Sequence, residues 1–213
     1  MYAIIKENDN IYLACNVLYG DNIHTKHGLE NSLIWKVKDR KNTYLVSNVN
    51  TPSWCFAKTL TGLFSTEDDK EPEINHEFIV THTLPIIYQA LKDKWFLDKD
   101  KLATLDFGFS VIHNDKRYDV DEYGYCHEIF DDVFNGLKQH LPRTISLLKT
   151  KGEDWKYRIL KEFVSIHEFN MYSAAPIFLV DVKNNKTKLY TMDQAIKYVK
   201  NYEKKGGKNK WLV

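Results

Sequence analysis

Three cysteines are the residues of this chain best suited to covalent chemistry, because a thiolate is an intrinsically strong nucleophile. They are Cys15, Cys55 and Cys126, an odd number without CxxC spacing, so neither a disulfide framework nor a zinc ribbon is expected. Cys15 is the strongest candidate nucleophile, since a cut before it would create an N-terminal cysteine followed by Asn16. The same cut would remove a predicted central strand from its sheet. A buried structural thiol is therefore the preferred interpretation of Cys15.

The other two cysteines have structural interpretations. Cys55 lies in an apolar stripe at helical spacing, which is typical of a core position. Cys126 is followed directly by His127, but neighbouring residues of a strand point to opposite faces of the sheet. We therefore do not expect a thiolate–imidazole pair at these positions.

Two segments contain residue types that bind metal ions. His24 and His27, in the segment HTKH, could share one side of a helical turn, with Glu30 as a third ligand nearby. Residues 119–124, DVDEYG, look superficially like a calcium loop, but they lack the remaining ligand spacing and the closing glutamate of an EF-hand. An exposed loop and a β-turn are the preferred interpretations. We expect no metal site and no cofactor.

Composition and charge limit the classes of protein that the chain can represent. Its 213 residues, 43% of them hydrophobic and 14% aromatic, suffice for one well-packed domain. The formal net charge of +1, from 30 basic and 29 acidic residues, argues against a nucleic-acid-binding protein. Apolar runs such as residues 174–180 are too short to cross a bilayer, and Lys6 and Glu7 interrupt the candidate for a secretory leader.

The use of cysteine and arginine indicates the cellular compartment and the type of genome from which the chain comes. Unpaired cysteines without a disulfide pattern are typical of a reducing compartment, so we expect a soluble, cytoplasmic protein. The chain has 26 lysines and 4 arginines, a bias that indicates an AT-rich genome, bacterial or viral. Few arginines also means few side chains that can bind a phosphate through two parallel hydrogen bonds.

Hydrophobic periodicity predicts a series of strands and helices. The strand pattern covers residues 1–6, 11–17, 32–37 and 43–49, three short strands within 105–129, a fourth within 132–137, and a hairpin at 175–190. The helical pattern covers residues 54–64, 73–94, 138–150, 155–169 and 192–202. Pro85 is expected to kink or split the second helix, because proline cannot donate a backbone hydrogen bond.

The order of these elements predicts the fold class. Groups of strands alternate with helices, mostly in pairs, and this pattern favours antiparallel sheets covered by helices over βαβ units. We predict an α+β fold, a four-layer αββα sandwich with two antiparallel sheets between helices. Residues 1–203 are expected to form one domain, and residues 204–213 a flexible basic tail.

This element order, with a strand that starts at residue 2, resembles the proteasome-like branch of the N-terminal-nucleophile (Ntn) hydrolases. The chain is most similar to the proteasome β subunit and to the related subunit of the bacterial two-component protease. The resemblance extends to about Tyr202 and rests on these segments: YAIIKENDNIYLACN, SLIWKV, VSNVNTPSWCFAKTLTGLF, FSVIHNDKRYDVDEYGYCHEI, FNGL and NMYSAAPIFLVDV.

The resemblance implies a specific chemistry at the first residue. In that family the mature chain begins with Thr, Ser or Cys, and its free amine accepts the proton of its own hydroxyl or thiol. A nearby lysine lowers the pKa of the amine, an acid positions the lysine, and backbone N–H groups of a glycine-rich loop bind the oxyanion. This chemistry would explain why a strand begins at the N-terminus, since the N-terminal residue is the reactive group in that family.

The chain departs from the family at most of the positions that match the family's site. The nucleophile position holds Tyr2, whose phenol has an ordinary pKa near 10 and is a poor attacking group. The acid position holds Asn16, which cannot carry charge, and only Ser173 retains the family's residue type. The oxyanion loop, residues 48–49, lacks its glycine. The matching positions are Tyr2, Asn16, Leu33, Asn135, Asn170 and Ser173.

Five substitutions together predict a site that has lost its chemistry. We therefore expect a non-catalytic protein of the proteasome-like fold that acts as a scaffold or binding subunit and self-assembles into a homo-oligomer. The alternative is an active peptidase or amidohydrolase of the same superfamily with a different nucleophile. A weaker third interpretation is a virus-encoded protein that binds a host protein.

The C-terminal tail is the candidate for a contact with a protein partner. Residues 204–213 are basic and end in Trp-Leu-Val, a combination that could dock in a groove. A frayed end is the interpretation we favour over docking. We expect neither a nucleic acid nor a membrane among the partners.

Overall fold

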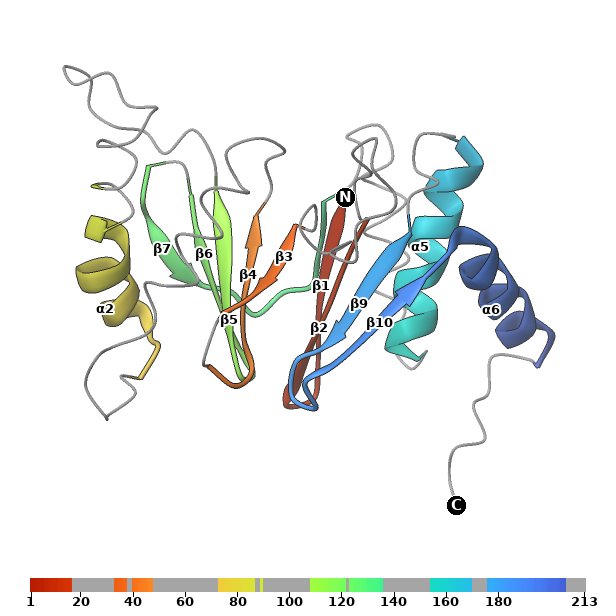
Figure 1. Cartoon of the computed structure of the whole chain (residues 1–213), viewed down its shortest axis with the longest axis horizontal. Coiled ribbons are helices and arrows are strands. Elements are labelled where there is room, and N and C mark those ends of the chain that lie inside the picture. Colours follow the sequence, from red (N-terminus) through yellow and green to blue (C-terminus); the bar gives the residue numbers. More distant parts are fainter. Residues whose placement is uncertain are drawn as a thin grey trace, which may run out of the picture. The chain divides into compact units, whose positions relative to one another are not determined.

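The computed structural model describes residues 1–16, 33–37, 40–47, 73–86, 89, 108–121, 123–135, 154–169 and 176–205 of the chain. The chain divides into two compact units. One unit, here called the terminal unit, contains residues 1–32 and 131–213, and the other, the middle unit, contains residues 33–130. Each unit contains one five-stranded sheet in which all strand pairs are antiparallel (Figure 1).

The sheet of the terminal unit joins the two ends of the sequence. Its strand order is β10-β9-β2-β1-β8, so the first strand lies between the second and the eighth. Asparagines with positive φ, Asn8 at 53° and Asn185 at 49°, lie in the turns of its two hairpins. Asparagine tolerates this conformation better than most residues. The elements are β1 (Tyr2–Glu7), β2 (Asn10–Asn16), β8 (Val133–Asn135), β9 (Ile177–Asp181), β10 (Lys186–Tyr190), α5 (Trp155–Phe169) and α6 (Met192–Lys204).

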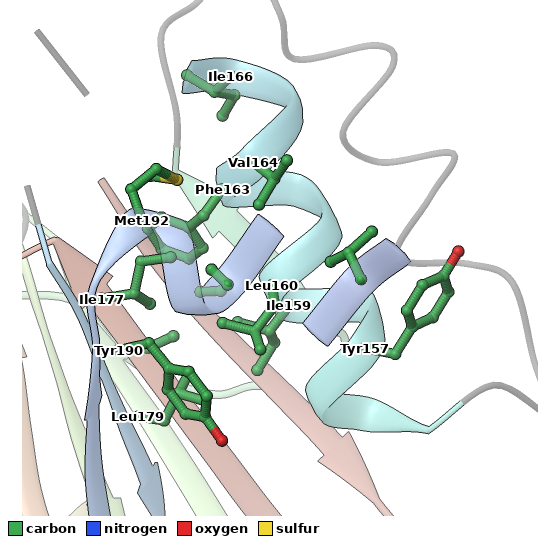
Figure 2. Packing of buried hydrophobic residues seen from close by; sticks show 14 of the residues in the cluster. Tyr157, Ile159, Leu160, Phe163, Val164, Ile166, Ile177, Leu179, Tyr190 and Met192 are labelled. Atoms are coloured by element: carbon green, nitrogen blue, oxygen red, sulfur yellow. The ribbon is translucent and has the colours of Figure 1, made fainter. Parts of the chain in front are cut away.

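Helices α5 and α6 pack on one face of this sheet and form its main core. Figure 2 shows Leu160 and Phe163 of α5 above Ile177 and Leu179 of β9. The rings of Phe163 and Phe134 meet edge to face, with their centroids 5.5 Å apart. Apolar residues at helical spacing therefore meet apolar residues at strand spacing, as the two periodicities predict.

The opposite face of the same sheet is also apolar and buried. Alternate positions of three strands contribute to it, and a strand with two buried faces reads as a nearly continuous apolar run, as residues 177–180 do. The side chains of this second face are Tyr2, Ile4, Ile11, Leu13, Cys15, Phe178 and Val180.

The sheet of the middle unit has the strand order β3-β4-β5-β6-β7, in which neighbours along the chain are also neighbours in the sheet. One face packs with a short helical segment around Val111, Tyr118 and Ile79. The opposite face buries Tyr44, Val46 and other apolar side chains. Its elements are β3 (Ile34–Lys36), β4 (Thr43–Ser47), β5 (Phe109–His113), β6 (Lys116–Val120), β7 (Cys126–Glu128), α2 (His76–Phe78) and the π-helix η1 (Ile79–Thr83).

The widened helical turn before Pro85 has a local cause. Helix α2 begins after Asn75, whose side chain accepts a hydrogen bond from the N–H of Phe78 at 2.9 Å. The N–H of Leu84 then donates to the carbonyl of Ile79, five residues earlier, as in a π-helix. Pro85 has no N–H to donate, so one bond of the regular helical pattern is lost. The disturbance is a π-turn just before Pro85, and the helix is not split there, since residues 84–86 are α-helical.

Most predicted elements are confirmed. Strands β1 and β2 each extend one residue beyond the predicted segment, to Glu7 and from Asn10, whereas the other strands lie within their predicted segments and α5 has the predicted bounds. Helix α6 extends to Lys204, two residues beyond its predicted end. The helices predicted at 54–64 and 138–150 lie outside the described residues, as do residues 206–213 of the tail. None of the described helices combines the length and the apolar character needed to cross a bilayer.

Candidate functional site

The N-terminal end of β1 is held by strands on both sides. Tyr2 lies opposite Cys15 of β2 and opposite Asn135 of β8. The N–H of Asn16 donates to the carbonyl of Met1 at 3.1 Å, so the ladder extends to the first residue. The structure thus brings Tyr2, Asn16, Asn135 and the rival nucleophile Cys15 to one end of one sheet.

The other positions that match the family's site lie in the middle unit or outside the described residues. Leu33 is buried, but it belongs to the middle unit. Asn170 and Ser173 lie outside the described residues.

The backbone position of Tyr2 suits a nucleophile, but its side chain does not. Only 8% of Tyr2 is exposed, and its side chain lies on the second face of the sheet, away from α5 and α6. Burial lowers the pKa of the Met1 α-amino group, and the electrostatic interaction with the neighbouring Cys15 acts in the opposite direction. An amine with a lowered pKa is a proton acceptor, but the side chain of its own residue is a thioether without a proton to give.

Cys15 is confirmed as a buried cysteine that forms no disulfide. It is fully buried, and it lies on β2 between Tyr2 of β1 and Phe178 of β9. A cut before Cys15 would remove β1 and most of β2 from the sheet. This position supports a structural role over that of an N-terminal nucleophile.

Asn16, which the sequence resemblance assigns to the position of the family's acid, is a buried neutral amide with 3% of its surface exposed. An ionised carboxylate there would hold a cationic lysine by charge, whereas an amide has only a dipole to offer. Leu33, at the lysine position, has no charge either. The charged pair that would activate an N-terminal amine is therefore missing from both positions.

The remaining sequence candidates are placed as expected where the structure describes them. Cys126 is buried whereas His127 is exposed, as neighbours on a strand should be. Burial, and secondarily the charge of Asp119, raises the pKa of the Cys126 thiol to about 11. Among the described residues there is no cluster of three or more His, Cys, Asp or Glu side chains that could hold a metal ion. His24, His27 and Cys55 lie outside the described residues.

Both described cysteines should react slowly with iodoacetamide in the native protein, because a thiol reacts as its thiolate and these two are buried. At pH 8 we expect labelling of Cys15 and Cys126 to become fast only in denaturant, with mass spectrometry of the digested protein as the measurement. Rapid native labelling of Cys15 would contradict its structural role and would favour the nucleophile interpretation.

Sequence analysis missed the ionic network that fixes the other end of β1. The Asp132 carboxylate accepts a hydrogen bond from the Lys6 N–H at 2.8 Å and another from the Arg158 guanidinium at 2.9 Å. Arg158 is 7% exposed and lies among apolar residues of α5. One feature of the sequence could have indicated this ion pair. The chain has only 4 arginines, one of them in a predicted helix, and arginine is favoured for buried ion pairs.

Glu7 lies beside this network and should make stability depend on pH. Burial raises the pKa of its carboxyl, and Asp154 and Asp132 act in the same direction, whereas Arg158 lowers it. The folded state therefore binds the proton of Glu7 more tightly than the unfolded state, and this contribution to stability is lost as pH rises through the raised pKa. Glu7→Gln should stabilise the protein at pH 7 relative to wild type, and the gain should shrink as pH falls towards 4, measured by urea unfolding. A gain that does not change with pH would contradict this assignment.

Comparisons with known proteins agree with the sequence resemblance at the level of fold. No family model and no curated protein matches the chain. Among solved structures it is similar to Thiobacillus denitrificans BPH, with a TM-score of 0.58, 15% identity, and coverage of 85% of this chain and 97% of that chain. BPH in complex with epoxomicin gives a TM-score of 0.58, 14% identity, and coverage of 85% and 98%. Anbu (ancestral beta-subunit) from Yersinia bercovieri gives a TM-score of 0.62, 9% identity, and coverage of 96% and 94%. The expected proteasome-like Ntn fold is thereby confirmed, whereas identities this low carry no activity with them.

Proposed function

We propose that this chain is a non-catalytic protein of the proteasome-like fold, which acts as a scaffold or binding subunit and assembles with copies of itself. The observation that carries the proposal is the register at the start of β1. The position where the Ntn fold presents a small hydroxyl or thiol holds the buried phenol of Tyr2, beside the neutral amide of Asn16.

The chemistry of these side chains supports the loss of hydrolysis. An Ntn nucleophile must give its proton to the amine of its own residue and then reach a substrate carbonyl. A phenol ring separates its oxygen from that amine by several bonds, and a neutral Asn16 removes the charge that would organise a lysine. Each loss alone reduces the rate, and together they leave no group to begin the reaction.

We also propose that the two sheets are the inner layers of an αββα sandwich. Each sheet has one face packed with helices and a second face of buried apolar side chains. Such a face needs an apolar partner, because exposing it to water is costly. The similarity to BPH and Anbu over most of the chain supports this arrangement as one domain, residues 1–203.

The proposal of self-assembly draws on a structural relative. The Yersinia protein is named a subunit, and this chain covers 94% of it. A protein that has lost the chemistry of its fold can retain the surfaces that join subunits. The C-terminal tail, residues 204–213, is our candidate for one such contact.

One observation favours the alternative of an active peptidase or amidohydrolase. The Met1 amine has a lowered pKa and lies near the Cys15 thiol, which gives a base and a nucleophile on adjacent strands. The complete burial of Cys15 argues against this alternative, because a substrate carbonyl could not reach the sulfur without opening the sheet.

Intact-mass spectrometry after incubation with epoxomicin tests the proposal. We expect an unprocessed terminus at Met1 or Tyr2 and no adduct, with Thiobacillus denitrificans BPH as the positive control, since that protein has been seen in complex with epoxomicin.

Light scattering on a sizing column should show an assembly of several copies. An adduct, a cleaved terminus, or peptide hydrolysis abolished by Cys15→Ala would overturn the non-catalytic assignment, and a monomer at high concentration would overturn self-assembly.

A further inference from the structure

The turn between β6 and β7 exposes two aromatic side chains to solvent. Tyr123 is 64% exposed and Tyr125 is 65% exposed, and Phe130 follows at 68%. These three are among only five large hydrophobic residues that are exposed in the described part of the chain, and they lie within eight positions of one another. Exposed aromatic residues that are clustered in this way are typical of a protein-binding surface.

Hydrogen bonds to and from Asp121 hold the backbone of this turn. The Asp121 carboxylate accepts hydrogen bonds from the N–H groups of Tyr123 and Tyr125, both at 2.9 Å. The N–H of Gly124 donates to the Asp121 carbonyl, and the N–H of Asp121 donates to the Tyr125 carbonyl, both at 3.0 Å. Gly124 has a φ of 81°, which glycine adopts without strain. The backbone positions of the two tyrosines are thus set by hydrogen bonds within the chain, and a backbone that is already ordered lowers the entropy cost of binding.

The charge around this turn defines the chemistry of its partner. Residues 118–130 contain four carboxylates and no lysine or arginine. Arg117 forms an ion pair with Asp119, whereas Glu128 is exposed on β7. The surface is therefore acidic and aromatic, and it fits a basic segment that also carries apolar side chains.

We propose that the Tyr123/Tyr125 turn binds the C-terminal segment, residues 206–213, of a second copy of this chain. That segment contains two lysines, no acidic side chain and the apolar sequence Trp-Leu-Val, and two more lysines, Lys204 and Lys205, directly precede it at the end of α6. Its charge and its aromatic side chain complement those of the turn. The inference rests on the proposed self-assembly and names the two surfaces that would form the contact.

Variants of the full chain test the contact by its effect on association. The double variant Tyr123→Ser/Tyr125→Ser should weaken self-association by about tenfold or more, because truncating aromatic anchors typically costs more than 1.4 kcal/mol, which is tenfold. Trp211→Ser should weaken it similarly, and combining it with the double variant should add little, since both remove the same contact. Leu189→Ser, at a position on β10 that is 53% exposed, is the matched control and should leave association unchanged. Sedimentation equilibrium measures the association, and circular dichroism checks that each variant is folded.

A photo-crosslinker separates a second copy from the same copy. With p-benzoylphenylalanine at position 125, a mixture of ¹⁵N-labelled and unlabelled protein should yield mixed-isotope products in which residues 206–213 are captured. Capture within one copy, capture of other residues, or an unchanged association constant for Tyr123→Ser/Tyr125→Ser would overturn the proposal. If the wild-type chain still self-assembles but the crosslinking and the double variant give these results, the proposed contact is wrong and the proposed self-assembly stands. An epoxomicin adduct would instead overturn the non-catalytic assignment and leave the crosslinking result intact.

Discussion

Phe163→Ala is expected to lower the free energy of unfolding by about 3 to 5 kcal/mol, the typical cost of removing a buried aromatic side chain. Phe163 lies fully buried in the middle of α5, where its ring packs against Phe134 of β8 and against the apolar residues of β9 (Figure 2). The truncation removes the packing of α5 on the sheet at this point, including the ring contact with Phe134 of β8, and it leaves a cavity that the surrounding residues can fill only in part.

The loss expected for Phe163→Ala is large compared with the total free energy of unfolding of a single domain. A single domain is stable by about 5 to 15 kcal/mol, so Phe163→Ala should remove about a fifth or more of the total free energy of unfolding and shift the urea midpoint strongly. Phe130→Ala makes the same chemical change at a residue that is 68% exposed and should change the free energy by about 0.5 kcal/mol or less. Equal effects of the two variants would show that α5 does not pack on this sheet as described.

Asp132→Ala is expected to cost about 2 to 4 kcal/mol, because it leaves the buried Arg158 guanidinium without its ionic partner and the Lys6 N–H without its acceptor. The Arg158 side chain is 8% exposed and that of Asp132 is 25% exposed, so water can replace the lost carboxylate only partly. The loss should fall on the end of β1 opposite to Tyr2, where Asp132 connects β1 to α5.

A double-mutant cycle tests the pairing itself. Arg158→Met retains the length and much of the apolar stem of the side chain, and combining it with Asp132→Ala should cost less than the sum of the two single changes. Asp131→Ala, at the adjacent exposed position, is the matched control and should cost about 1 kcal/mol or less. Strict additivity of Asp132→Ala and Arg158→Met in urea unfolding would show that the ion pair contributes nothing beyond its separate parts.

The candidate site was predicted only in part from the sequence. The pattern of residues 1–16 predicted a hairpin that starts at the second residue, and the structure pairs Tyr2 with Cys15 accordingly. No local pattern could place Asn135 opposite Tyr2, because these residues are separated by more than a hundred positions and their pairing depends on β8 joining the far side of β1. The Asp132–Arg158 pair escaped prediction for the same reason.

The sequence by itself determined the local structure of this protein. Alternating apolar residues specified the strands, and the 3.6-residue pattern specified α5 with its full bounds. Pro85 indicated a disturbance of the second helix, which the structure shows as a π-turn. Only the tertiary structure decided the sheet order β10-β9-β2-β1-β8 and the neighbours of Tyr2. The physical reason is that local conformation depends on propensity and periodicity within a few residues. The choice of partner strand, by contrast, depends on burying apolar faces that come from distant parts of the chain.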